Sequence, residues 1–321
     1  MKQTKGWSFL IGILLVAAGL TLVLAVFVFS GWDLGKLNTT LCVSNSYDIE
    51  EPFAEIRVKT TTAAVRFARS SDGTCRVACY ENEKMPHTVA VEDGCLTVSV
   101  RDERKWMDHI SLFSVSNPEI TVFLPQNEYV KLAVSVTTGS VDIPGGFAFG
   151  EMDISCTTGS VKSMASVTGK AAIVGTTGWV KLSDAAVGAL DISLATGNID
   201  LRNVSCAENA GLRVTTGKTQ VSGMTCGSFA SKGSTGDLVL EHLLVEGSLS
   251  ATRSTGDVKL ESCDAGEITI TTDTGDITGT LLSEKVFSAK TDTGRVHLPQ
   301  TFSGGKCSLT TDTGDIQIAL K

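Results

Sequence analysis

The sequence predicts an all-β protein: a right-handed parallel β-helix (β-solenoid) of about ten coils, with a strand-rich N-terminal cap and one transmembrane helix before it. Three observations lead to this prediction. A Thr-Gly pair recurs ten times at intervals of 19 or 20 residues, apolar and polar residues alternate on both sides of each pair, and a long uncharged run lies near the N-terminus. With 42% hydrophobic and only 19% charged residues, the composition excludes a disordered chain, and its glycines do not follow the collagen period.

The uncharged run covers residues 7–29 and reads WSFLIGILLVAAGLTLVLAVFVF. As a helix it would be about 34 Å long, enough for a hydrocarbon core of about 30 Å. Lys2 and Lys5 precede it, so the positive-inside rule places residues 1–6 in the cytoplasm and the solenoid outside the cell. A cleaved signal peptide is the alternative, but its apolar region would span only about 7–15 residues and end in a small-residue cleavage site. We therefore expect a single-pass anchor in the cell membrane, with the lipid bilayer as its partner, followed by a stalk over 30–47.

Residues 48–131 are rich in strand patterns that do not keep the later register. Strands are expected at the segments 56–60, 64–67, 75–80, 88–91, 96–100 and 119–124. We interpret this region as a cap of antiparallel strands, with one degenerate coil at 56–67, that covers the first open coil of the solenoid. The apolar segment 106–113 is expected to be a loop or short helix packed on the cap, in preference to a partner-binding or membrane-apposed patch.

The solenoid itself is predicted over 132–321, with one Thr-Gly corner in each coil. The ten structural corners are Thr138-Gly139, Thr158-Gly159, Thr177-Gly178, Thr196-Gly197, Thr216-Gly217, Thr235-Gly236, Thr255-Gly256, Thr274-Gly275, Thr293-Gly294 and Thr313-Gly314. The positions five before and two and four after each glycine are mostly apolar and those between them polar, which indicates two short strands flanking each corner. Glycine permits positive φ or close approach to neighbouring coils, and the threonines would form a ladder with a spacing of about 4.8 Å. The side chains that one coil can bury do not offset the entropy lost on ordering it, so only a stack of coils is stable. The crossover rule for parallel strands predicts that the stack is right-handed.

Acidic side chains gather at the corners of the later repeats. Candidate cation ligands are Asp273, Asp292 and Asp312, two residues before their glycines and expected on successive coils, with Asp276 and Asp315 one residue after theirs. Such like charges repel unless salt, a proton or a divalent cation relieves them. Because no loop is long enough to complete a cage, we expect a solvated edge and neither a metal site nor a cofactor.

The nine cysteines do not have zinc-ligand spacing. Three of them, Cys156, Cys263 and Cys307, fall in inward columns, where a free thiol behaves as a small hydrophobic group. Cys206 and Cys226 should stack one coil apart; a disulfide between them is conceivable, but free thiols are favoured.

Catalytic residues are not expected in this sequence. Lys162 and Lys181, beside Asp142 and Asp200, come nearest to the groove of a polysaccharide lyase. However, coils of 19 or 20 residues leave no room for groove-forming loops. The net charge of −8 and the lack of a basic run with interleaved aromatic residues argue against nucleic acid as a partner.

The repeats resemble those of the bacterial putative-adhesin family, membrane-anchored domains of unknown function with T-T-G-S-V and D-T-G-D-I repeats. The resemblance covers about 48–321 and lies in the segments 137–141, 157–161, 234–238, 273–277 and 312–316. The chain departs from the pattern where Trp179, Asn198, Lys218 and Arg295 replace the usual Ser or Asp after the glycine. The resemblance implies a β-solenoid on the outer face of a mostly Gram-positive cell, with no catalytic residues.

These observations together predict a membrane-anchored cell-surface protein, an adhesin or extracellular binding scaffold without catalysis. Its partner would be a surface ligand or another membrane protein. The alternative is a sensor or regulator of cell-envelope stress that acts through a membrane partner, and a polysaccharide-active enzyme is less favoured.

Overall fold

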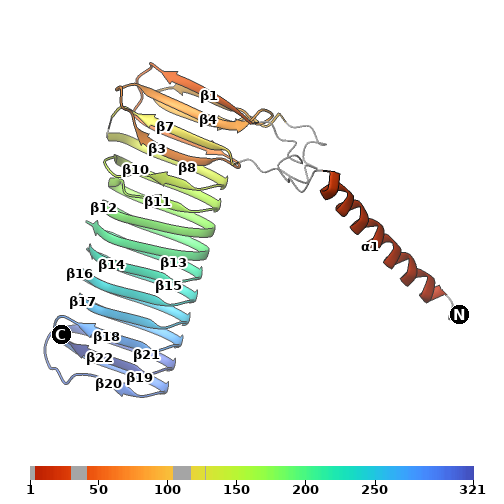
Figure 1. The fold of residues 1–321 in the computed structure, drawn as a ribbon. Helices are drawn as coiled ribbons and strands as arrows, with labels where there is room; N and C mark the ends of the chain where they lie inside the picture. The colour runs from red at the N-terminus through yellow and green to blue at the C-terminus, as the bar shows by residue number, and fades with distance from the viewer. Residues whose placement is uncertain (1–3, 30–41, 104–116, 127) are drawn as a thin grey trace.

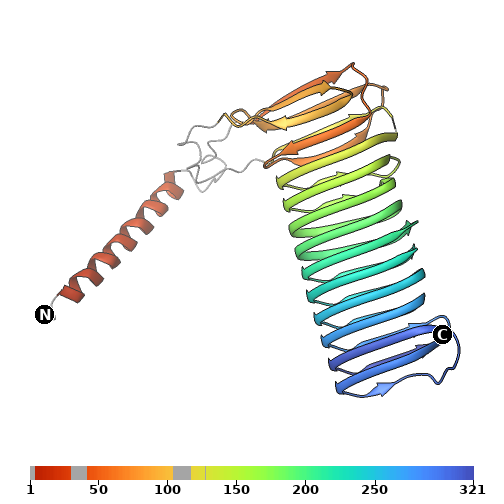
Figure 2. The ribbon, with the colours of Figure 1, turned by 180° about the vertical axis from the view of Figure 1, so that it is seen from behind.

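The computed structural model describes residues 4–29, 42–103, 117–126 and 128–321. Within these residues, one helix, α1 (Thr4–Phe29), is followed by strands and no further helix, and the strands wind into a rod of stacked coils (Figures 1 and 2). The helix is rich in Leu, Ala and Val and contains no proline, so nothing interrupts its hydrogen-bond ladder. Among the residues described, no helix reaches the length and hydropathy required of a membrane span. The expected loop at 106–113 and most of the expected stalk lie outside the described residues.

Seven strands form the N-terminal cap and fifteen form the coils. The cap strands are β1 (Cys42–Ile49), β2 (Glu55–Thr60), β3 (Ala64–Arg69), β4 (Cys75–Asn82), β5 (His87–Glu92), β6 (Cys95–Val100) and β7 (Glu119–Leu124). The coil strands are β8 (Glu128–Thr138), β9 (Val141–Ile143), β10 (Ala148–Thr158), β11 (Val161–Ser163), β12 (Ser166–Cys206), β13 (Asn209–Thr216), β14 (Thr219–Cys226), β15 (Ser228–Thr235), β16 (Leu238–Thr255), β17 (Val258–Thr274), β18 (Ile277–Leu281), β19 (Lys285–Thr293), β20 (Val296–His297), β21 (Gly305–Thr313) and β22 (Ile316–Leu320).

Successive coils pair in parallel and in register. Ile154 of β10 lies between Val134 of β8 and Ile173 of β12, and the corner residue Thr158 likewise pairs with threonines on both sides. The predicted β-solenoid of about ten turns is therefore confirmed. Its right-handedness stays a prediction.

The inward columns form one continuous core. Val141, Val161 and Val180, two residues after their glycines, are each 1% exposed, and the same column continues as Ile199, Leu238, Val258, Ile277 and Ile316. Stacking like residues on like fills each layer of the interior without voids. The core accounts for the alternation seen in the sequence, because every second residue of each strand points into it.

Arg253 is an exception inside this core, with only 2% of its surface exposed. Its guanidinium lies beside Gly233 of the preceding coil and donates hydrogen bonds to the Thr252 carbonyl and to Ser231 Oγ, at 2.8 and 2.9 Å. Burial lowers the pKa of Arg253 to about 10, although Asp237 acts in the opposite direction. The missing side chain at Gly233 provides the space that the arginine fills.

The cap is not purely antiparallel, which corrects our expectation. β2 pairs in parallel with β6 on one side and β8 on the other, and β3 does the same with β7 and β9. Only β1–β4, β4–β7 and β5–β6 are antiparallel. The alternation of apolar residues is the same for both pairings, so it could not distinguish them. β1 also includes residues 42–47, which we had assigned to the stalk.

The last three coils do not stack in sequence order. The Gly275 amide donates to the Thr313 carbonyl and the Gly314 amide donates to the Thr293 carbonyl, so the coil of Gly314 lies between those of Gly275 and Gly294 (Figure 1). β21 accordingly pairs with both β17 and β19. The inserted coil carries the fully buried Leu309 and Ile316, whereas Val296 of the outermost coil is 46% exposed. Placing the more apolar coil inside buries more hydrophobic surface.

Candidate functional site

A second corner follows five of the Thr-Gly corners, six residues after the glycine. The residues there have positive φ between 51° and 67°, and they are Asp184, Asn203, Gly223, His242 and Ser262. Asp and Asn tolerate this left-handed conformation better than most side chains. Asn203 Nδ2 also donates to Asp184 Oδ1 of the coil before it, at 2.9 Å. Sequence analysis missed this column because five different residue types were read as unrelated, although their common distance from the glycine was available.

A groove of about 1020 Å³ runs along the rod next to the second corner. Its floor is a row of buried residues from six successive coils: Val167, Val187, Cys206, Cys226, Val245 and Ala265. Gly188 lines the groove where two coils approach closely, since a Cβ there would lie 2.5 Å from the Thr168 carbonyl oxygen. At a coil spacing of about 4.8 Å the floor is about 24 Å long. It offers apolar contact over that length.

The two adjacent groove cysteines, like the other seven, are free thiols. Burial raises the pKa of Cys226 to about 12, helped by the neighbouring Cys206, whose pKa burial also raises. Both sulfurs therefore stay protonated at neutral pH and are poor nucleophiles.

One ion pair closes an end of the groove. Lys285 Nζ lies 2.6 Å from Asp264 Oδ1 and donates to Ser283 Oγ at the same distance. The lysine side chain is 5% exposed and the aspartate side chain 31%. Burial raises the pKa of Asp264, but hydrogen bonds from Lys285 and Ser283 lower it by more, so the pKa lies below its ordinary value.

We expect Asp264→Ala to lower the free energy of unfolding by about 2 kcal/mol, because it leaves a buried ammonium without its carboxylate. Denaturant unfolding measures this, and Lys285→Met added to the variant should restore most of the loss. Asp191→Ala is the matched control, since Asp191 pairs with Lys170 at 3.3 Å on the exposed surface and should cost less than about 1 kcal/mol. Because the pKa of Asp264 is lowered, its contribution is present above about pH 4 and is lost as the pH falls further. Equal losses in Asp264→Ala and Asp191→Ala would contradict this.

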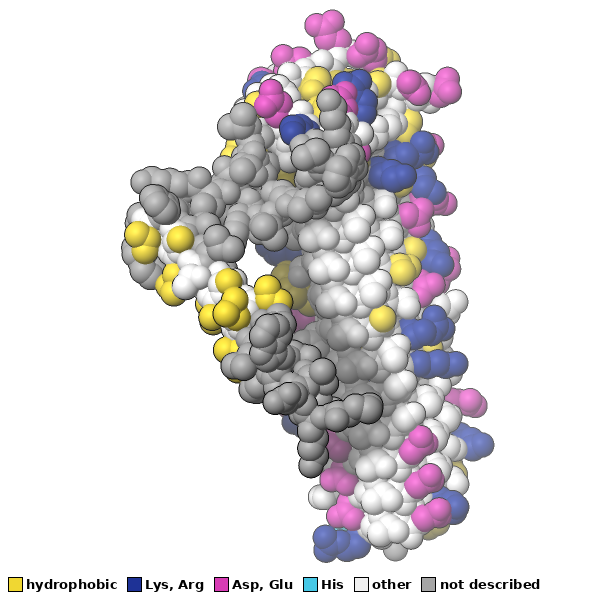
Figure 3. All heavy atoms as spheres, turned by 90° about the vertical axis from the view of Figure 1, so that its right-hand side faces the viewer, with side chains coloured by type: hydrophobic (Ala, Val, Ile, Leu, Met, Phe, Trp, Pro, Cys, Tyr) yellow, Lys and Arg dark blue, Asp and Glu magenta, His cyan; other side chains and the backbone are white. Residues whose placement is uncertain are grey.

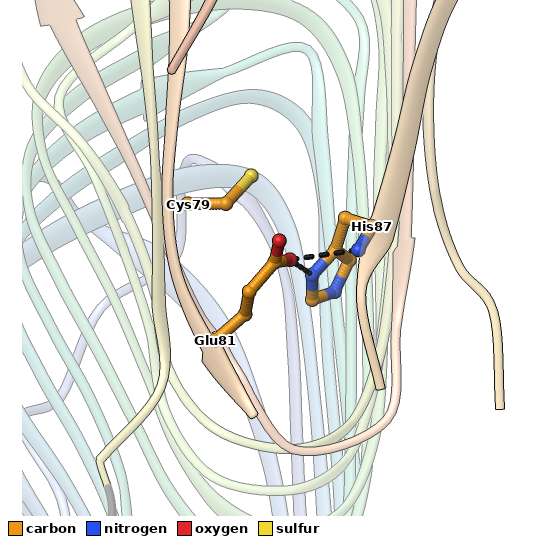
Figure 4. Close-up of side chains that lie close together, drawn as sticks. All are labelled: Cys79, Glu81 and His87. Atoms are coloured by element: carbon orange, nitrogen blue, oxygen red, sulfur yellow. Dashed lines mark hydrogen bonds and ion pairs between the residues drawn. The ribbon is translucent and has the colours of Figure 1, made fainter. Parts of the chain in front are cut away.

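The cap contains the most deeply buried polar cluster among the described residues (Figure 4). Glu81 and His87 are 0% and 5% exposed, with His87 Nδ1 2.5 Å from Glu81 Oε2. The Glu81 carboxylate also accepts from the His87 amide at 2.7 Å and from Asn45 Nδ2 at 2.6 Å. Thr60 Oγ1 lies 3.0 Å from His87 Nε2, so both ring nitrogens have partners.

Cys79 lies beside this pair, and one ligand atom from each of Cys79, Glu81 and His87 falls within 4.8 Å of the others. That combination could hold a metal ion in principle. The ring nitrogens and the carboxylate are already hydrogen-bonded, however, and burial, with the charge of Glu81, raises the pKa of Cys79 to about 12. The arrangement fits a structural cluster that ties β1, β2, β4 and β5 together better than a metal or catalytic site.

The acidic corner residues have a structural role that the sequence did not reveal. The carboxylates one residue after the glycines accept hydrogen bonds from the backbone amides of the next coil: Asp276 donates its N–H to Asp257 at 2.9 Å and Asp315 donates its N–H to Asp276 at 2.7 Å. The series ends at Arg295, whose N–H donates to Asp315 at 2.8 Å and whose guanidinium lies 3.4 Å from the same carboxylate. Each carboxylate thus satisfies an amide at the turn, where the coil ladder is interrupted.

The order of the outer acidic residues corrects our expectation. Because the coil of Gly314 is inserted, Asp312 lies between Asp273 and Asp292, and these last two are not neighbours. Lys290 Nζ lies 2.9 Å from Asp292, so part of the charge repulsion is compensated on the outermost coil.

We expect calcium to have only a weak effect on this edge, in the millimolar range and partly reproduced by monovalent salt. Thermal unfolding of the full-length protein against calcium at constant ionic strength tests this. A shift at micromolar calcium that Asp292→Asn abolishes would contradict it.

A smaller hollow of about 410 Å³ lies beside Trp179 and spans three coils. Trp179 is 45% exposed, and the hollow is also lined by Lys181, Asn198, Asp200, Lys218 and Gln220. The four residues that come nearest to a lyase groove in the sequence, Lys162, Lys181, Asp142 and Asp200, are only partly brought together here. Lys162 pairs with Asp142 at 3.9 Å and Asp200 pairs with Arg202 at 2.9 Å.

Comparison with known families identifies the fold. A model described as Toastrack DUF4097 matches residues 53–223 and 207–321, which is most of the chain. The chain belongs to the Toastrack DUF4097 family. The resemblance to a putative-adhesin family of unknown function, predicted from the Thr-Gly repeats, is thereby confirmed.

The Toastrack chain is also similar to solved structures at low identity. One is a putative adhesin from Bacteroides fragilis, with 15% identity over 87% of this chain and 97% of that one and a TM-score of 0.37. A putative adhesin from Parabacteroides distasonis has 12% identity over 88% and 98%, with a TM-score of 0.45. A putative lipid-binding protein from the same species has 13% identity over 86% and 97%, with a TM-score of 0.37. No curated protein matches the Toastrack chain.

Proposed function

We propose that this Toastrack protein is a membrane-anchored binding scaffold that performs no catalysis, with its N-terminus in the cytoplasm and its solenoid on the outer face of the cell. The observation that carries the proposal is the in-register stack, in which equivalent side chains of successive coils are held at one fixed spacing. Such a surface can present several contacts to an extended ligand without reorganising, and this reduces the entropy lost on binding.

The outward side chains support a display role. Figure 3 shows lysine, arginine, aspartate and glutamate side chains gathered along one edge of the rod. Some pair between coils, as Lys131 does with Glu151 at 2.9 Å and Asp153 at 3.1 Å. A surface of mixed, regularly spaced charges gives specificity for a partner of matching charge.

The membrane part of the proposal rests on the sequence. The run 7–29 contains no charge and lies within helix α1, and Lys2 and Lys5 precede it. A run of this length and composition is typical of a single membrane span.

Protease added to intact, wall-stripped cells that produce the full-length protein tests the topology. We expect the solenoid to become accessible to the protease, whereas a cytoplasmic reporter protein in the same cells stays intact. Because a stacked solenoid resists cleavage, an unfolding Gly197→Ala variant provides a matched substrate that must be degraded if it lies outside. Full protection of that variant would contradict the proposed topology.

A further inference from the structure

The hollow beside Trp179 differs chemically from the rest of the solenoid surface. Trp179 stands at the position after Gly178, where most other coils carry Ser or Asp. The residue is 45% exposed in a chain with only 6% aromatic residues. Removing an indole ring from water is favourable, so the exposed ring of Trp179 is available for apolar contact with a ligand.

Polar side chains from the coil of Trp179 and the next two coils line the hollow. Asn198 and Lys218 follow Trp179 in the same column, and Lys181, Asp200 and Gln220 form the neighbouring column. The Asn198 carboxamide oxygen accepts a hydrogen bond from the Lys218 backbone N–H at 2.8 Å, and its NH₂ group can donate to a ligand. The side-chain amides of Asn198 and Gln220 supply hydrogen-bond donors and acceptors beside the apolar indole ring of Trp179. Such a combination suits a ligand that has both hydroxyl groups and C–H faces.

The charges of the hollow are positive on balance. Asp200 is neutralised by Arg202, with Nε 2.9 Å from Oδ1, whereas Lys181 and Lys218 have no carboxylate within 4.0 Å among the described residues. These two ammonium groups therefore form a local positive region on a protein whose net charge is −8. They belong to coils two apart, about 10 Å along the rod, so an extended molecule is needed to reach both.

We propose that the Trp179 hollow binds an acidic oligosaccharide, a chain of sugar rings that carry carboxylates. The C–H face of one ring stacks on the indole, whose π-face is negative, and the ring carboxylates meet Lys181 and Lys218. The hydroxyl groups exchange hydrogen bonds with Asn198 and Gln220. This inference names a ligand class for the binding scaffold proposed above. It rests on that proposal only for the location of the ligand, outside the cell.

Calorimetric titration of the purified full-length protein in detergent with an oligogalacturonate tests the proposal. We expect binding that Trp179→Ala weakens about tenfold or more, whereas Trp179→Phe keeps most of the affinity. Lys181→Gln and Lys218→Gln should each weaken binding about threefold and reduce its dependence on ionic strength. Two matched controls should bind like the unchanged protein: Phe302→Ala, at an aromatic residue that is 94% exposed elsewhere, and Lys232→Gln, on a different column.

Two further probes separate the sugar ring from the charge. Maltotriose has rings without carboxylates and polyglutamate has carboxylates without rings, and we expect both to bind at least tenfold more weakly than the oligogalacturonate. The proposal is overturned by no detectable binding of oligogalacturonate, by equal binding of either probe, or by full affinity in Trp179→Ala. These titrations do not depend on membrane topology, and the protease experiment requires no ligand, so the two proposals fail separately.

Discussion

Replacing Gly197 by alanine should lower the free energy of unfolding by about 4 kcal/mol or more, a loss large enough to unfold a marginally stable domain. Gly197 has a φ of +139°, and a Cβ built on it would lie 1.5 Å from the Gly178 carbonyl oxygen of the preceding coil. The backbone of one of the two coils would have to move, which would break the ladder in the middle of the stack. The shift in the denaturant midpoint, followed by circular dichroism, measures the effect.

Two matched substitutions separate this steric conflict from the general cost of replacing a glycine. Gly145→Ala should be almost neutral, because its Cβ would meet only Met164 at 3.7 Å, an ordinary contact. Gly294→Ala should be intermediate: its Cβ would lie 2.0 Å from the Gly314 carbonyl oxygen, but its coil is outermost and can move away. If all three variants lost the same stability, close approach of neighbouring coils would not explain why glycine recurs at every Thr-Gly corner of this chain.

Replacing Ile316 by alanine should cost about 2–5 kcal/mol, although the residue lies near the C-terminus, where substitutions in a solenoid are ordinarily cheap. Ile316 is fully buried between Ile277 and Val296 of the coils on either side. Its alanine variant would leave a cavity that neighbours on both faces prevent from collapsing. Denaturant unfolding of the full-length protein measures the change.

Val296→Ala is the matched control, because Val296 occupies the same column two residues after its glycine. It is 46% exposed, so we expect a loss below about 1 kcal/mol. A solenoid stacked in sequence order predicts the opposite ranking, with the interior Val296 costly and the terminal Ile316 cheap. The two substitutions therefore also test the insertion of the last coil.

The sequence was sufficient to predict the coils and not the order in which they stack. Parallel pairing depends on columns of equivalent inward residues. The alternation of apolar and polar residues around Thr-Gly defines these columns in each repeat. Every coil carries nearly the same columns, however, so Gly275 can stack as well on Gly314 as on Gly294. Which coil lies outside is decided by small differences in burial, such as that between Ile316 and Val296, which become visible only when both positions are compared in space.

The polar features were predicted less well, for a related reason. Glu81 and His87 come from neighbouring strands, but their partners Asn45 and Thr60 lie far away in the sequence, and only the paired cap brings the four together. The pattern of apolar inward residues does not account for Arg253, and the space for its side chain is explained only by Gly233 on the neighbouring coil. The acidic residues were recognised, but their role as acceptors for the amides of the next coil depends on side-chain direction and not on spacing.

The inserted last coil has a consequence for how the protein is made. A chain emerges from the ribosome N-terminus first, so the segment 285–297 is complete before 305–320 exists. Its strand β19 pairs with β21 in the finished fold, so it cannot take its final place until β21 has been synthesised. At the other end, the coil of β2 and β3 must likewise wait for β6 to β9 before both of its faces are covered. A chain that stopped before residue 305 would lack the layer between β18 and β20 and would leave β17 and β18 without their partners β21 and β22. The distal end of the rod therefore reaches its final stacking order only after residues 305–320 have been translated.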